Sequence, residues 1–131
     1  MQKDISEFED VKLLVDKFYA KVLKDDTIGY IFNEVLTINW NHHFPIMYSF
    51  WQSVLLGVGG YKGNPVRVHI ELNDKEPLTE THFNRWMELW EATIDENFIG
   101  NKAEEAKAKA QAMKTLMLYK IQASQNPNFI Q

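Results

Sequence analysis

The sequence predicts an all-α fold, on three observations. Apolar residues recur at spacings of three and four along four long segments, which is the period of an amphipathic helix. Signals that start and stop helices stand at the ends of these segments, and no segment predicts a convincing strand. At 131 residues the chain has the length of one ordinary domain, which can bury about two-thirds of the surface of its unfolded chain. A single domain over residues 1–131 is therefore expected.

The first long helix is expected near the N-terminus. Ser6 followed by Glu9 has the spacing of a capping box at its start. The acidic pair 25–26 marks a stop, residues 27–32 predict one or two turns of a short helix, and 33–39 predict an irregular connection. The apolar face of the long helix consists of Val11, Leu14, Val15, Phe18, Tyr19 and Val22.

The second long helix is expected over about 41–56. Pro45 is compatible with this helix if it lies in the first turn, where most amide donors lack a helical partner anyway. Four glycines and a proline within residues 57–65 then predict a loop. The apolar stripe of the helix holds Trp40, His43 or Phe44, Met47, Phe50, Trp51, Val54 and Leu55.

The rest of the chain predicts one short helix and two long ones. The short helix, over about 65–71, carries His69 and is followed by a polar connection. Thr79 is the expected cap of the next helix, and Gly100 suits its C-terminus. Asn101 opens the last helix. The inward residues are Phe83, Trp86, Met87, Trp90 and Ile94 on the first of these long helices, and Ala106, Ala110, Met113, Leu116, Met117 and Ile121 on the second.

Composition excludes several classes of function. The formal net charge is −4, and without a dense basic cluster the chain is not expected to bind nucleic acid. The absence of cysteine excludes disulfides, thiolate-held iron–sulfur clusters, a cysteine nucleophile and covalent or thiolate-bound haem. The N-terminus lacks a signal-peptide stretch, and no apolar run is long enough to span a bilayer. We therefore expect a cytoplasmic monomer without a membrane partner.

Four histidines could carry chemistry, and they lie on three different segments. No duplicated Glu-x-x-His motif supports a di-iron carboxylate bundle, and no local spacing supports a three-ligand zinc site. His43 lies on the apolar stripe of the second long helix, and His69 stands between two β-branched residues. Taken alone, each suits a structural histidine satisfied by a hydrogen bond. Placed on opposite walls of an aromatic-rich space, they would suit a haem pocket, which needs a basic nitrogen and apolar walls.

Aromatic residues make up 13% of the chain, a high share for a small helical domain. Such rings could fill a core or line a pocket for a large flat ligand. Tyr19 and Trp86 each bring a hydrogen-bond donor into an otherwise apolar region, although core packing accounts for either residue as well. A helical interaction module with no cofactor therefore stays open as an alternative at this point.

Several motifs resemble the truncated haemoglobins. Residues 18–22 and 29–32 look like the early helices of that family. Residues 40–51, with the pattern W-x-x-H-x-P-x-M-x-x-F-W, are similar to the second long helix of its group III branch. Residues 55–69 resemble the loop and proximal segment of that branch, and 83–86 resemble the start of its next long helix. The resemblance covers nearly the whole chain.

The resemblance implies a truncated globin-like two-over-two helical sandwich around a non-covalently bound haem b. It implies that His69 is the proximal ligand of the iron and that the iron binds O2, NO or CO reversibly. It also implies that Tyr19, His43 and Trp86 lie on the distal side, near the bound gas. The residues expected to contact the haem are His69, Phe32, His43, Met47, Phe50, Trp51 and Trp86.

Two uses of such a haem stay open. One is storage or sensing of O2 or NO by reversible binding. The other is catalysis, either conversion of O2 and NO to nitrate or a peroxidase-like reaction. Catalysis would need a separate reductase, because the sequence contains no flavin domain.

Lys62 and Arg67 are expected partners of the haem propionates by charge and position.

Overall fold

The computed structural model describes residues 2–61, 63, 69, 71–73 and 75–124. Within this part of the chain the only β-pairing is an isolated bridge between Lys3 and Phe98. Residues 69, 71–73 and 75 are helical, whereas most of the predicted short helix at 65–71 lies outside the described residues. The named elements are α1 (Phe8–Val22), the π-helix η1 (Ile31–Val35), α2 (Trp40–Leu56), α4 (Glu80–Asn97) and α5 (Asn101–Ser124).

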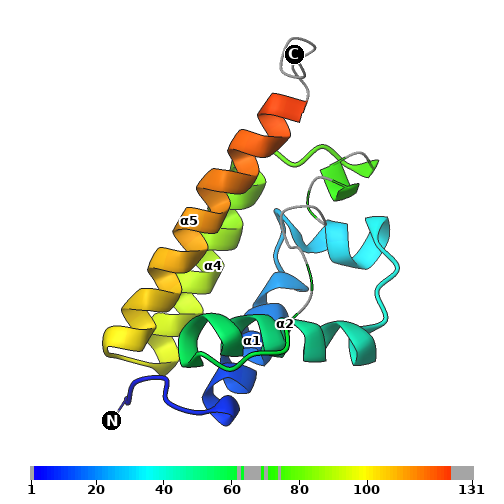
Figure 1. The fold of residues 1–131 in the computed structure, drawn as a ribbon. Coiled ribbons are helices and arrows are strands. Elements are labelled where there is room, and N and C mark those ends of the chain that lie inside the picture. Colours follow the sequence, from blue (N-terminus) through cyan, green and yellow to red (C-terminus); the bar gives the residue numbers. More distant parts are fainter. Residues whose placement is uncertain (1, 62, 64–68, 70, 74, 125–131) are drawn as a thin grey trace.

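The four long helices form two pairs (Figure 1). Helices α4 and α5 lie side by side and run antiparallel, joined by the short connection at 98–100. Helices α1 and α2 form the second pair, in which α1 packs against α4 and α2 packs against α5. The predictions of an all-α fold and of a two-over-two helical sandwich are confirmed. No described helix has the length and apolar character needed to cross a membrane.

Hydrophobic periodicity predicted the inward faces of α1 and α4 well. All six residues predicted for the inward face of α1 are buried. On α4, Phe83, Met87, Trp90 and Ile94 are buried, while Trp86 is half-buried. The expected cap Thr79 is the N-cap of α4, and its side chain accepts a hydrogen bond from the backbone amide of His82.

Buried side chains form two separate core clusters. The large core joins all four long helices, with Trp51 from α2, Trp90 from α4 and Ala106 from α5. Alanines on α5 leave room for α4 to come close, and Nε1 of Trp90 donates a hydrogen bond to the Ala106 carbonyl at 3.1 Å. Phe32 and Met113 pack against both clusters. The small core consists of Ile31, Leu78, Phe83, Met117 and Ile121.

The capping box of α1 lies one residue later than predicted. Glu7, not Ser6, is the N-cap, and Asp10, not Glu9, is its partner. Asp10 accepts hydrogen bonds from the amides of Ser6 and Glu7, and its carboxylate is 2.6 Å from Nζ of Lys3. The Lys3 ammonium thus adds an ion pair to the residue that closes this capping box.

Pro45 is the sixth residue of α2 and so lies beyond the first turn. The helix nevertheless continues through Pro45. The missing amide would have bonded to the carbonyl of Asn41, an exposed residue one turn earlier. The helix begins where Asn39, its N-cap, accepts a hydrogen bond from the amide of His42 at 3.3 Å.

Three other local predictions are wrong. Residues 33–35 belong to the π-helix, not to an irregular connection. Gly100 does not end α4, which is capped by Phe98; it lies between α4 and α5 at φ +138, where the Asp4 side chain occupies the place of a Cβ. Leu116 is 45% exposed, because it is turned by about 100° around the helix axis from its buried neighbour Met117.

Candidate functional site

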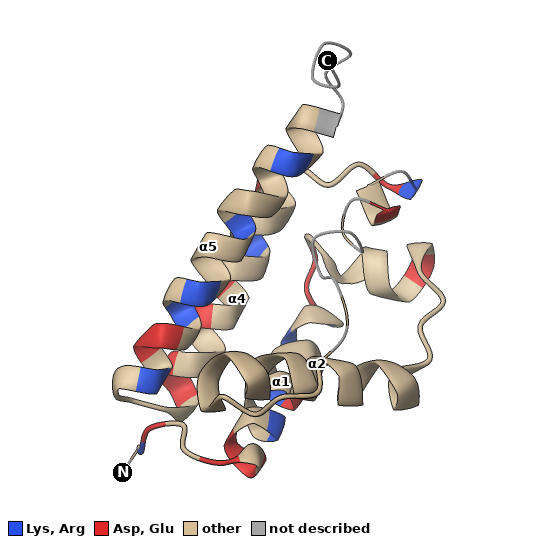
Figure 2. Ribbon diagram, viewed as in Figure 1, with Lys and Arg blue, Asp and Glu red and all other residues tan. Residues whose placement is uncertain are grey.

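Helix α2 is an apolar helix that the described chain covers only in part. None of its 17 residues is acidic, lysine or arginine, and Figure 2 shows it without charge along its length. Yet Trp51 and Leu55 are its only buried residues, while Met47 and Phe50 are half-buried. Apolar surface gains about 25 cal/mol for each Å² removed from water, so this face favours an apolar ligand.

Tyr19 stands at the centre of an aromatic cluster between α1 and α2. Its side chain is buried, and its hydroxyl lies 3.4 Å from Nε2 of His43. The rings of Phe32, Trp40 and Phe44 surround it at centroid distances of 5.9, 5.5 and 5.6 Å, each presented close to edge-on. The structure therefore brings together three of the predicted site residues, Tyr19, His43 and Phe32.

Burial controls the protonation of this cluster. Burial raises the pKa of the Tyr19 hydroxyl well above its ordinary value, so the phenol keeps its proton. The pKa of His43 is lowered, first by burial and then by repulsion from His42 and His69. His43 is therefore neutral at neutral pH and has one donor and one acceptor nitrogen.

His69 lies against the small core. Its ring centroid is 6.2 Å from that of Phe83, with the planes tilted by 40°, and its side chain is half-buried. Tyr19, the neighbour of His43, belongs instead to the large core. The two histidines thus contact different core clusters. Phe32 packs against both the large core and the small core.

Trp86 and Trp51 are connected through a third tryptophan. Trp86 lies parallel to Trp90 at 6.3 Å, and Trp90 stacks on Trp51 at 4.5 Å. Phe18 contacts both Trp86, at 5.9 Å, and Tyr19, at 5.2 Å. Trp86 is therefore linked to the Tyr19 cluster through one intervening ring.

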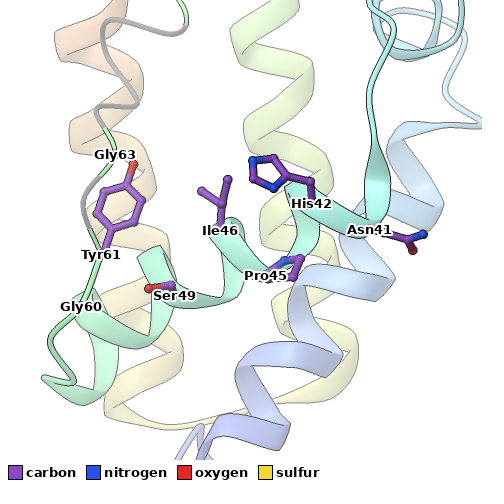
Figure 3. Close-up of a pocket in the computed structure, with 8 residues that line it drawn as sticks. All are labelled: Asn41, His42, Pro45, Ile46, Ser49, Gly60, Tyr61 and Gly63. Carbon is purple, nitrogen blue, oxygen red and sulfur yellow. The ribbon is translucent and has the colours of Figure 1, made fainter.

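A cavity of about 540 Å³ opens between α2 and the glycine-rich loop that follows it. Figure 3 shows Tyr61 on the loop, across from Ile46 and His42 on α2. The predicted site residues are not among those that line it. Lys62 and Arg67, the expected propionate partners, lie outside the described residues. The lining residues are Asn41, His42, Pro45, Ile46, Ser49, Gly60, Tyr61 and Gly63.

Sequence reasoning did not single out Trp40 or Phe44 as site residues, although both contact Tyr19. It left His43 and Phe44 as alternatives on one stripe, whereas both are half-buried and both face Tyr19. The spacing of Trp40 and Phe44 could have predicted this contact, because residues four apart lie on the same face of a helix. Among the residues that the structure describes, no three histidine or acidic side chains converge to hold a metal ion.

Two comparisons with known proteins point to truncated hemoglobins of Campylobacter jejuni. The chain is 33% identical to group 3 truncated hemoglobin ctb over 90 residues, which are 66% of this chain and 68% of that protein. Its fold matches the crystal structure of group III truncated hemoglobin with a TM-score of 0.79 at 27% identity, over 92% of this chain and 95% of that one. No family model matches the chain.

Proposed function

The chain belongs to the group III truncated haemoglobins, and on that premise we propose that it binds haem b non-covalently and carries O2, NO or CO reversibly. Globin membership implies haem. When bound, the haem would supply an iron atom that binds a diatomic gas, and a histidine of this chain would hold it. The lack of cysteine excludes the thioether attachment of a c-type haem, which agrees with a non-covalently held haem.

The observation that carries the proposal is the placement of His43 and His69. His43 contacts Tyr19 of the large core, and His69 contacts Phe83 of the small core. Two basic nitrogens on separate apolar clusters form the donor set that a haem needs. The half-buried apolar face of α2 supplies a wall for the macrocycle, so the residues present fit a haem.

His69 is the proposed iron ligand, and His43 the proposed distal histidine. Nε2 of His43 already faces the Tyr19 hydroxyl at 3.4 Å, which suits a group that orients a hydrogen bond. His69 lies against the other cluster, in a segment that resembles the proximal segment of the family.

On the distal side, Tyr19 is the main hydrogen-bond donor in this proposal. Its raised pKa keeps the proton on the hydroxyl, and the tautomer of His43 protonated at Nε2 would donate to the Tyr19 oxygen and leave the phenolic proton for the gas. A hydrogen bond from Tyr19 to a gas atom with partial negative charge contributes about 1.5–3 kcal/mol. The Trp86 indole is a second donor, linked to Tyr19 through Phe18. Slow release of O2 follows, which suits retention better than bulk transport.

The remaining predicted contact residues differ in exposure. Met47, Phe50 and Phe32 are half-buried and pack against the large core, so part of each ring or chain is free to cover a haem. Trp51 is only 2% exposed and is stacked on Trp90. We propose that Trp51 supports the wall from behind and that Met47, Phe50 and Phe32 contact the haem.

Titration with hemin tests this function. The wild-type protein is expected to bind one equivalent with a sharp Soret band, and His69→Ala is expected to lose that band or broaden it. His42→Ala is the matched control, because His42 is an exposed histidine next to His43 in the sequence and is not among the proposed haem contacts. Binding no tighter than that of an unrelated apolar protein, or an unchanged spectrum in His69→Ala, would contradict the proposal.

A further inference from the structure

Tyr48 and Asp16 form a hydrogen-bonded pair between α2 and α1 for which the proposed function gives no role. The Tyr48 hydroxyl donates a hydrogen bond to Oδ1 of Asp16. The other carboxylate oxygen of Asp16 lies 2.8 Å from Nζ of Lys12, and that ammonium also lies 5.7 Å from the Tyr48 ring centroid. Tyr48 is half-buried, so solvent reaches part of this group.

A line of rings connects this pair to the proposed gas-binding region. Tyr48 stacks on Phe44 at 5.9 Å with the planes only 15° apart. Phe44 meets Tyr19 at 5.6 Å, and the Tyr19 hydroxyl faces His43. The path therefore runs from a carboxylate near the surface to the distal side through two tyrosines and one bridging phenylalanine.

The carboxylate gives Tyr48 a property that an isolated tyrosine lacks. A phenol that loses an electron becomes strongly acidic, so oxidation of tyrosine is easy only where a base can take the phenolic proton. Asp16 is placed to do so along the existing hydrogen bond. Burial and the neighbouring Asp16 raise the pKa of Tyr48, so the phenol stays protonated until it is oxidised. Phe44 has no hydroxyl and serves only as a bridge between the two phenols.

We propose that Tyr48 is a one-electron oxidation site through which the haem-loaded protein reduces hydrogen peroxide, with Asp16 as the proton acceptor. This inference rests on the proposed haem binding. Tyr48 gives an electron toward the haem pocket through Phe44 and Tyr19, and its proton to Asp16, which leaves a neutral tyrosyl radical. A phenolic hydrogen-atom donor from solution returns one electron and one proton to Tyr48. Two such cycles, with the two protons released from Asp16, convert one H2O2 to two molecules of water.

The stack of Trp86, Trp90 and Trp51 offers a rival route. It continues through Phe50, 5.2 Å from Trp51, to Tyr61, 5.0 Å from Phe50. Both routes end on a half-buried tyrosine. What favours Tyr48 is the acidic partner on its hydroxyl. The experiment must therefore distinguish Tyr48 from Tyr61.

Electron paramagnetic resonance of the haem-loaded protein, frozen shortly after mixing with H2O2, tests the proposal. A tyrosyl signal, identified by its change on ring deuteration of tyrosine, is expected in the wild type and in Tyr61→Phe, and is expected to vanish in Tyr48→Phe. Asp16→Asn keeps a hydrogen-bond acceptor but removes the base, and should slow formation of the signal on the order of 100-fold.

The Soret band of each variant is recorded first, so that loss of haem binding is separated from loss of the radical. A wild type without haem would refute the proposed function itself. With haem bound, a signal that survives in Tyr48→Phe, or vanishes in Tyr61→Phe instead, would overturn only the role of Tyr48. Formation at the wild-type rate in Asp16→Asn would overturn the role of Asp16.

Discussion

The Tyr19 hydroxyl lies 3.4 Å from Nε2 of His43, joining the buried face of α1 to the start of α2. This contact holds a protonated phenol beside a neutral imidazole within a cluster of aromatic rings. In the proposed function it fixes where the hydrogen-bond donor points. It also makes Tyr19 the residue whose removal should change the chemistry of the gas most selectively.

Tyr19→Phe is expected to speed the release of O2 from the ferrous protein. The lost hydrogen bond is worth about 1.5–3 kcal/mol, which corresponds to roughly tenfold to a hundredfold in rate, since about 1.4 kcal/mol is tenfold. The release of CO should change little, because bound CO carries less negative charge. Stopped-flow replacement of each gas measures both rates. Equal acceleration of O2 and CO would point to altered access to the pocket and would refute the hydrogen bond.

The ion pair between Arg85 and Asp25 should make stability depend on pH. Burial raises the pKa of Asp25, but the Arg85 guanidinium, 2.7 Å away, and the amides of Ile28 and Thr27 outweigh it, so the pKa lies below its ordinary value. In the unfolded chain the pKa of an aspartate is about 3.9. The contribution of ionised Asp25 to the free energy of unfolding is therefore fully present above that pH, and it is lost as the pH falls through the lower pKa of the folded protein.

Replacement of the guanidinium isolates this pH effect. Arg85→Gln should lose less stability than the wild type between pH 7 and pH 3, because its Asp25 gains less from being ionised. Urea unfolding at both values measures the two losses. Asp4 and Asp10 also have lowered pKa values, but they are common to both proteins and cancel in the comparison. Equal losses of stability in the wild type and in Arg85→Gln would show that Arg85 does not contribute to the pH dependence of stability.

Asp4 caps α5 from the other end of the chain. Its carboxylate oxygens accept hydrogen bonds from the amides of Lys102 and Ala103, each at 2.9 Å. Asp4→Ala should lower the free energy of unfolding by about 0.5–2 kcal/mol, and Asp4→Asn by less, since one acceptor oxygen is kept. Urea midpoints give the comparison, with Glu91→Ala on the exposed face of α4 as the control. If Asp4→Ala unfolded at the wild-type midpoint, the cap would contribute nothing to stability.

Periodicity predicted the parts of the fold in which residues near in sequence determine the outcome. Along α1 the apolar residues recur every three or four positions, which matches the period of the helix. All six residues of its inward face were therefore predicted. The N-cap Thr79 was found for a similar reason, because its hydrogen-bond partner is three residues away.

The features that were missed depend on contacts between distant residues. Asp4 caps a helix that begins 97 positions later. Tyr48 meets Asp16 only because α1 and α2 pack together. In the candidate site, His43 and His69 were predicted from their motifs and stay a prediction, and their placement beside two separate clusters is seen only in the fold.

The most direct test of the central claim is the spectrum of the ferrous CO complex in His69→Gly, with and without added imidazole. If His69 holds the iron, the wild-type protein gives the spectrum of a histidine-held haem. His69→Gly should lose it, and imidazole bound in the vacated space should restore it, while His43→Gly keeps it. A wild-type spectrum in His69→Gly without imidazole, with its loss in His43→Gly, would contradict the account and would assign the iron to His43.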